Sequence, residues 1–212
     1  MTKVAAVLAL VLAGSTASAR PPSQPIESGE LRSLLPAGAT IEVQLDADIT
    51  GDGLRDIVAV GRGEDERKLV VLAAYSTDTD MGYRPVGSMA MDFSLLGSAE
   101  LSLKAGVLIV KDLTGGTTSI SSLYRFRYEK PADKMRLIGD DVTLYSRTNS
   151  HGSVEVSTNR LTGVQIVIRK QIKGEGENAS LIRGSALVKR VLRKPIYMED
   201  APDPSETVGF GN

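Results

Sequence analysis

The feature that most constrains the fold is an alternation of apolar and polar residues with a period of two. It is clearest in residues 123–128, LYRFRY, where the aromatic rings fall on one face and the arginines on the other. Successive side chains of a β-strand point to opposite faces, so this pattern predicts a half-buried strand. Similar period-2 or β-branched segments recur at residues 40–45, 57–60, 68–75, 100–103, 107–110, 142–146, 153–158 and 165–172. The chain is therefore predicted to be all-β.

Short turns rich in glycine, threonine and asparagine separate these segments, as at residues 61–63, 114–116 and 162–163. Parallel strands would need long helical crossovers, which the sequence does not offer, so the strands should form antiparallel hairpins. We expect these hairpins to be arranged as propeller-like blades or as a sandwich. A short N-terminal helix is predicted over residues 29–35, because Ser28 can cap it and Pro36 stops it.

The N-terminus has the pattern of a secretory signal peptide. Lys3 precedes an apolar block at residues 4–13, and a small-residue segment ends in Ala17-Ser-Ala19. The apolar block is half of the roughly 20 residues that a membrane-spanning helix needs. Cleavage after Ala19 and export to the bacterial periplasm or beyond are therefore predicted, without a membrane span.

The predicted organisation is a signal peptide at residues 1–19, a flexible leader at 20–29, a single β domain at 30–198 and a mobile acidic tail at 199–212. The leader and the tail are rich in proline and polar residues and have little to bury. The chain has no cysteine, so disulfides and thiolate metal sites are excluded. Residues 186–194 fit a strand and a helix equally well, because their apolar pairs recur every four residues.

A loop at residues 48–56, DITGDGLRD, carries the densest polar pattern in the chain. Counted from Asp48, oxygen-bearing side chains fall at positions 1, 3, 5 and 9, and the carbonyl of position 7 is in phase with them. Calcium takes six to eight oxygen ligands, and glycines allow a loop to curl around it. The pattern predicts one structural Ca²⁺ held by Asp48, Thr50, Asp52, the Leu54 carbonyl and Asp56. The alternative is a turn whose aspartates point to water.

The loop is not an EF-hand, because position 12 is Ala59 inside a predicted strand and no helix follows. It resembles the calcium loops of FG-GAP and VCBS-type repeats, which join two antiparallel strands of a propeller-like blade. Thr50 departs from the aspartate or asparagine usual at its position. The nearest later echo, at Asp112, lacks the other acids, so a closed propeller is not predicted. Residues 100–203 also resemble small exported bacterial proteins that carry such a loop near their start.

Charge is distributed unevenly along the chain. Residues 20–100 carry 7 Lys and Arg against 14 Asp and Glu, whereas residues 101–212 carry 17 against 12. The cations of the second half are spread along the predicted strands and are not interleaved with stacking aromatics. No nucleic-acid partner is therefore predicted, while a protein or glycan partner stays open. The sequence does not indicate an oligomeric state.

Catalytic signatures were sought around the single histidine, His151, which lies in the turn-like segment at residues 149–152. No nucleophile elbow, phosphate-binding loop or HExxH motif accompanies it, so we predict a solvated turn residue and no catalytic residues. Two classes of function remain open. The first is an exported, non-enzymatic calcium-binding β-module with a binding or structural role. The second is a periplasmic inhibitor or immunity protein acting on a cell-wall hydrolase or toxin, or a hydrolase itself. Residues 114–122 are the candidate for a projecting inhibitory loop, and the alternative for them is an ordinary long hairpin tip.

Overall fold

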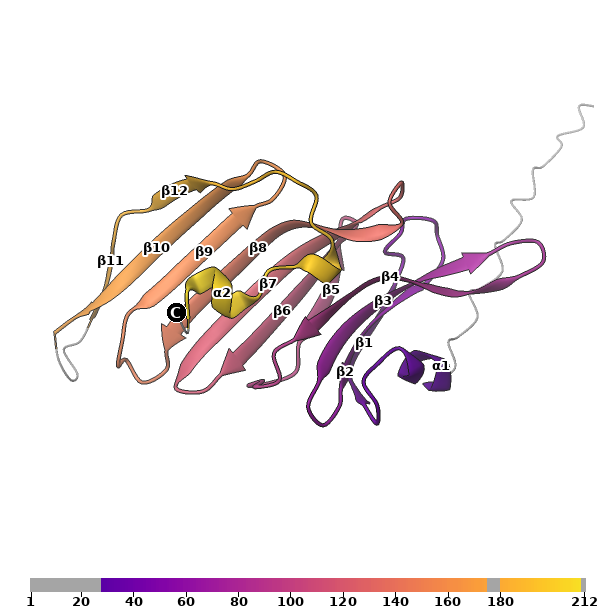
Figure 1. Cartoon of the computed structure of the whole chain (residues 1–212), viewed down its shortest axis with the longest axis horizontal. Coiled ribbons are helices and arrows are strands. Elements are labelled where there is room, and N and C mark those ends of the chain that lie inside the picture. The colour runs from indigo at the N-terminus through magenta and orange to yellow at the C-terminus, as the bar shows by residue number, and fades with distance from the viewer. Residues whose placement is uncertain (1–27, 175–179, 211–212) are drawn as a thin grey trace, which may run out of the picture.

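Two antiparallel β-sheets contain most of the residues that the computed structural model describes, which are residues 28–174 and 180–210 (Figure 1). One sheet has four strands and the other has eight. This arrangement confirms the predicted all-β fold of antiparallel hairpins. The predicted signal peptide, residues 1–19, and residues 20–27 of the predicted leader lie outside the described part of the chain. No helix in the described part is long and apolar enough to cross a membrane.

The four-stranded sheet is a meander in which each strand pairs with the next along the chain. Its strands are β1 (Thr40–Ala47), β2 (Asp56–Arg62), β3 (Arg67–Ser76) and β4 (Met81–Met91). Helix α1 (Ser28–Ser33) covers one face, where Leu31 and Leu35 pack against Ile57 and Leu72. The other face packs on the larger sheet. Because both faces are covered, β2 is buried along nearly its whole length, which explains its unbroken apolar run.

The eight-stranded sheet follows the chain order from one edge almost to the other. Its strands are β5 (Glu100–Lys104), β6 (Val107–Gly115), β7 (Thr118–Glu129), β8 (Lys134–Ser146), β9 (Ser153–Asn159), β10 (Val164–Lys173), β11 (Ser180–Arg183) and β12 (Leu187–Arg190). β11 and β12 both pair with β10, so together they form one interrupted edge strand. The ambiguous residues 186–194 therefore include a strand, and no helix forms there.

The main core lies between the smaller sheet and strands β5–β8 of the larger one. Val58 and Val71 of the smaller sheet belong to the same buried cluster as Leu108, Phe126 and Leu137 of the larger sheet. Phe126 is fully buried, as the alternation of residues 123–128 predicts. The two sheets thus form a sandwich at one end of the larger sheet.

The C-terminal segment covers the middle of the larger sheet, on the face that the smaller sheet also covers (Figure 1). It contains a short 3₁₀ helix, η2 (Met198–Asp200), and a helix, α2 (Pro204–Val208). Asp203 caps α2 by accepting hydrogen bonds from the amides of Ser205 and Glu206, and Pro204 occupies its first turn. Met198 is fully buried, and Val208 packs into a second cluster with Val156 and Val167. The predicted mobile tail is therefore wrong for residues 199–210.

Candidate functional site

The loop between β1 and β2 has the curled shape that its glycines predict. Gly51 and Gly53 have φ angles of 78° and 86°, in the left-handed region that favours glycine. Antiparallel pairing resumes directly after the loop, where Asp56 lies opposite Ala47. The loop thus joins two antiparallel strands, in the position that the resemblance to blade calcium loops implies.

Asp48 closes the outer part of this loop. Its Oδ1 accepts hydrogen bonds from the amides of Gly51 at 2.8 Å and Asp52 at 3.1 Å, and its Oδ2 accepts one from Gly53 at 2.9 Å. Asp52 is exposed, and its Oδ1 accepts a hydrogen bond from the Leu54 amide at 2.8 Å. Side-chain to backbone bonds of this kind hold a tight turn.

Asp56 holds the inner part of the loop against the sheet. It is fully buried, and its Oδ2 accepts hydrogen bonds from the amides of Ile49 at 2.7 Å and Thr50 at 2.8 Å. Its Oδ1 accepts a third from Ala74 of β3, also at 2.8 Å. Burial raises the pKa of Asp56, and the three amides oppose that rise. One carboxylate therefore ties the loop to the interior of the sheet.

The donor chemistry of the loop fits calcium better than its geometry does. Its oxygens are hard ligands, and the buried Thr50 hydroxyl makes no hydrogen bond of good geometry to the described residues. Asp56, however, is committed to three amides. The described residues contain no group of three or more His, Cys, Asp or Glu side chains arranged to hold a metal ion. The five predicted ligands lie in one loop, and calcium binding stays a prediction.

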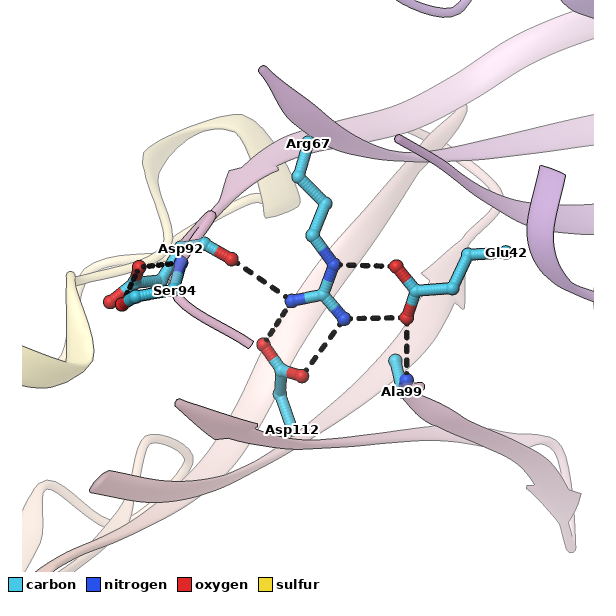
Figure 2. A network of polar contacts seen from close by, with 6 residues as sticks. All are labelled: Glu42, Arg67, Asp92, Ser94, Ala99 and Asp112. Atoms are coloured by element: carbon cyan, nitrogen blue, oxygen red, sulfur yellow. Dashed lines mark hydrogen bonds and ion pairs between the residues drawn. The ribbon is translucent and has the colours of Figure 1, made fainter. Parts of the chain in front are cut away.

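A second polar cluster, which the sequence did not predict, lies between the two sheets (Figure 2). Arg67 of β3 makes two hydrogen bonds to Glu42 of β1, from Nε to Oε2 and from Nη2 to Oε1, both at 2.7 Å. It makes two more to Asp112 of β6, at 2.7 and 3.0 Å, and one to the Asp92 carbonyl at 3.0 Å. All five N–H donors of the guanidinium are thereby used. Glu42 also accepts a bond from the Ala99 amide at 2.7 Å, so the network joins both sheets and the loop between them.

The charges of this inter-sheet clamp, Glu42, Arg67 and Asp112, are almost completely removed from water. The Arg67 side chain is 0% exposed, and those of Glu42 and Asp112 are 6% and 7% exposed. Burial opposes the charge of Arg67, but its hydrogen bonds to Glu42 and Asp112 outweigh that effect and raise its pKa. Burial also opposes the charge of Glu42, whose bonds from Arg67 and Ala99 hold its pKa below the ordinary value. Burial raises the pKa of Asp112, and Arg67 opposes that rise.

One signal in the sequence could have revealed the clamp. Asp112 lies between Val110 and Thr114 at alternate positions of β6, on the face that the period of two directs inward. An acid at such a position needs a buried partner. The sequence pattern at Asp112 indicates only an echo of the calcium loop. Its role is instead to hold the sheets together.

A cavity of about 280 Å³ lies beside the clamp, between the sheets and the C-terminal segment. Its lining includes Asp112, Tyr124 and Pro202. The Tyr124 hydroxyl donates a hydrogen bond to the Pro202 carbonyl at 2.6 Å, and burial raises the pKa of Tyr124. The carboxylate of Asp112 is occupied by Arg67. The Tyr124 hydroxyl thus attaches the C-terminal segment, and the Asp112 carboxylate belongs to the clamp.

His151 is held more firmly than the sequence predicted. Its Nδ1 donates a hydrogen bond to the Gly152 carbonyl at 2.7 Å, so Nε2 is the acceptor for the Thr118 hydroxyl at 2.8 Å in the neutral ring. The half-buried ring therefore links the β8–β9 turn to the start of β7, rather than lying in water.

Residues 114–122, the candidate projecting loop, form an ordinary hairpin tip, which was the alternative for this segment. These residues belong mainly to β6 and β7, which turn tightly at Gly116 and Thr117. Thr114, Ser119 and Ser122 are buried. The strands continue almost to the tip of the hairpin, and these small polar residues are buried within the sheet.

The far end of the larger sheet carries a different kind of surface. Residues paired across antiparallel strands share a face, so the register of β10 with β11 and β12 separates the side chains on the α2 face from those on the opposite face. We call the opposite set the β10–β12 outer face. None of its nine side chains is buried, six are aliphatic and three are cationic: Val164, Ile166, Ile168, Ile172, Leu181, Val188, Lys170, Arg183 and Arg190.

Several of these aliphatic side chains are strongly exposed, with Leu181 at 51% and Val188 at 62%. Lys170 is paired with Glu155 of β9. Arg190 donates to the Thr162 carbonyl at 3.3 Å, and neither Arg183 nor Arg190 has an ion-pair partner among residues 28–174 and 180–210. The face therefore offers apolar surface and two cations that the described part of the protein does not neutralise.

The chain matches no protein-family model, no curated protein and no solved structure. A role must therefore be inferred from the geometry and chemistry of the three regions described above, which are the loop at residues 48–56, the inter-sheet clamp and the β10–β12 outer face.

Proposed function

We propose that the protein is an exported β-module that acts by binding a partner, without catalysis, and that the β10–β12 outer face is its binding surface. The observation that supports this proposal is the exposure of the aliphatic side chains on that face, which reaches 62% for Val188. Aliphatic side chains gathered in water and flanked by charges are typical of interaction sites. A partner that covers them gains about 25 cal/mol for each Å² of apolar surface removed from water.

The uses of the other polar clusters also support a binding role. The carboxylate of Asp56 accepts three hydrogen bonds inside the fold, and the guanidinium of Arg67 uses all five of its donors there. Both nitrogens of His151 are engaged as well. We therefore assign a structural role to these clusters and place recognition at the far end of the larger sheet.

Sedimentation with total cell-envelope material tests this proposal. We expect the wild-type protein to sediment with the envelope, and Val188→Asp to abolish sedimentation because a carboxylate would have to be buried against the partner. The matched control is Leu96→Asp, since Leu96 is also an exposed aliphatic residue, at 37%, but lies in the loop after β4. If Val188→Asp and Leu96→Asp sediment equally, the outer face is not the binding surface.

We also propose that the loop at residues 48–56 binds one structural calcium ion, on the basis of its donor chemistry. Exported calcium modules bind at about 10⁻⁴–10⁻³ M, and a tenfold excess of ion over Kd stabilises by about 1.4 kcal/mol. We expect the melting temperature to rise by about 3–6 °C in millimolar calcium relative to chelator. Magnesium should have a smaller effect, because it sheds water reluctantly and requires octahedral geometry.

Asp52→Ala is the informative variant for this calcium prediction. Asp52 is exposed and accepts a hydrogen bond from the Leu54 amide, so its loss should remove the calcium response with little change in stability in chelator. Asp65→Ala, at an exposed position in the β2–β3 turn, should keep the response. If wild-type melting is the same in calcium and in chelator, the loop is held by its amides alone.

A further inference from the structure

We infer that the partner of the β10–β12 outer face is the surface of a bilayer rich in anionic lipids. The inference rests on the proposed function, because it names the class of partner for the same surface. It is argued from the sign of the charges, the kind of apolar residue and the side-chain types that the face lacks.

The charge at this end of the sheet is of one sign. The described residues of β10, β11 and β12 include six cationic side chains and no acidic one. On the outer face, Arg183 and Arg190 lack ion-pair partners in the described part of the chain, whereas Lys170 is neutralised by Glu155. Each Lys or Arg near an anionic membrane contributes about 1 kcal/mol of attraction. Charge complementarity therefore selects an anionic partner.

The apolar residues indicate what else the partner must offer. Ile166, Leu181 and Val188 are exposed on the same face as Arg183 and Arg190. Interfacial membrane binding combines shallow burial of apolar side chains at the headgroup and acyl boundary with cations at the phosphates. Long arginine side chains reach the headgroups while their stems stay against apolar surface. The outer face has both components within three neighbouring strands.

A protein partner is less well matched to this face. Protein interfaces draw most of their energy from tryptophan, tyrosine and arginine and carry about one hydrogen bond per 100–200 Å². The nine residues of the outer face include no aromatic residue and none of Ser, Thr, Asn or Gln, and the neutral polar side chains next to them on the same face of the sheet, Ser153, Ser157 and Asn159, lie on β9. A fluid surface that needs only aliphatic contact and phosphate neutralisation fits it better.

A second copy and a nucleic acid are also disfavoured. Two copies packed face to face would bring two surfaces together whose only charged side chains are cationic, which costs electrostatic energy. The interruption of the edge strand at residues 184–186 works against edge-to-edge pairing, as bulges do in natural sheets. Single-stranded nucleic acids need aromatic side chains for stacking, and the face has none.

The test uses the mature protein and vesicles of two compositions, equal parts phosphatidylglycerol and phosphatidylcholine, or phosphatidylcholine alone. We expect sedimentation with the anionic vesicles and at least tenfold weaker partitioning to the neutral ones, with binding reduced by added salt. Arg183→Gln combined with Arg190→Gln should lower partitioning to anionic vesicles about 30-fold. Leu181→Ser combined with Val188→Ser should lower it at least about tenfold.

The matched control is Arg84→Gln combined with Lys134→Gln, because both residues are exposed cations on other strands, at 38% and 48% side-chain exposure. It should bind like the wild type, and melting curves of every variant show whether folding is retained. Equal binding to both vesicle types, or binding to soluble heparin that depends on the arginines but not on Leu181 and Val188, would overturn the lipid inference. If anionic vesicles fail but envelope material is still bound in a Val188-dependent way, the inference fails while the proposed function stands.

Discussion

Replacing Arg67 with methionine should destabilise the protein by about 3–5 kcal/mol, because it leaves two carboxylates buried without their cation. The substitution removes the five bonds that Arg67 makes to Glu42, Asp112 and the Asp92 carbonyl. Methionine occupies much of the space of the aliphatic part of arginine, so the loss of stability reports on charge and hydrogen bonding more than on packing. Urea unfolding, followed by circular dichroism, measures the free energy of unfolding.

The same variant should show a distinct dependence on pH. Without Arg67, the pKa values of Glu42 and Asp112 in the folded state should lie above their unfolded values, because burial disfavours the charged forms. The folded state then binds protons more tightly, so stability is retained at low pH and lost as pH rises through those values. The deficit relative to the wild type should therefore be largest near neutrality and shrink in acid.

Arg84→Met is the control for this prediction. Arg84 also pairs with an aspartate, Asp133 at 2.7 Å, but the two side chains are 38% and 49% exposed. Ion pairs at the surface contribute about 0–1 kcal/mol. If Arg67→Met and Arg84→Met cost the same, the clamp does not hold the two sheets together.

Asp56→Ala should cost about 3–5 kcal/mol, since it leaves the amides of Ile49, Thr50 and Ala74 buried without an acceptor. Part of the gross loss is offset, because the buried carboxylate itself carries a desolvation cost, which its raised pKa reflects. Urea unfolding gives the total effect. Amide hydrogen exchange at Ala74 should become faster, since that N–H loses its hydrogen bond to the Asp56 carboxylate.

Asp48→Ala tests whether this effect depends on burial. Asp48 also accepts three amide hydrogen bonds, but it is exposed, so water can replace it at the freed amides. We expect a cost of about 1 kcal/mol, the typical value for a lost cap. If Asp48→Ala lowers the free energy of unfolding as much as Asp56→Ala does, burial of the carboxylate does not determine the size of the effect.

Most of the fold could be predicted because period-2 alternation is a local signal. The alternation at residues 123–128 predicted that the aromatic face of this strand packs on the core. The unbroken apolar run at residues 57–60 is explained because α1 covers the second face of the small sheet. The C-terminal segment was missed because its burial depends on two separated side chains, Met198 and Val208. The sequence does contain a helix-start signal there, the capping residue Asp203 followed by Pro204. The acidic, proline-containing composition of the segment does not show this signal.

The candidate sites were harder to predict because they depend on which strands meet in space. The clamp joins Glu42, Arg67 and Asp112, whose positions are up to 70 residues apart in sequence numbering, on strands of two different sheets. Residues 48–56 form a loop between two strands, as the sequence predicts. A carboxylate that accepts hydrogen bonds from amides and a carboxylate that binds an ion look the same in a sequence, so the pattern does not distinguish these two roles. The outer face of β10–β12 became visible only with the strand register.

A local fluorescent probe shows whether the β10–β12 outer face contacts the partner. The chain has no cysteine, so Val188→Cys provides a single attachment point for an environment-sensitive dye, and Leu96→Cys provides the control. On addition of envelope material, we predict a blue shift and an increase in emission for the dye at position 188 and no change at position 96. An unchanged spectrum at position 188, or a shift confined to position 96, would contradict the account.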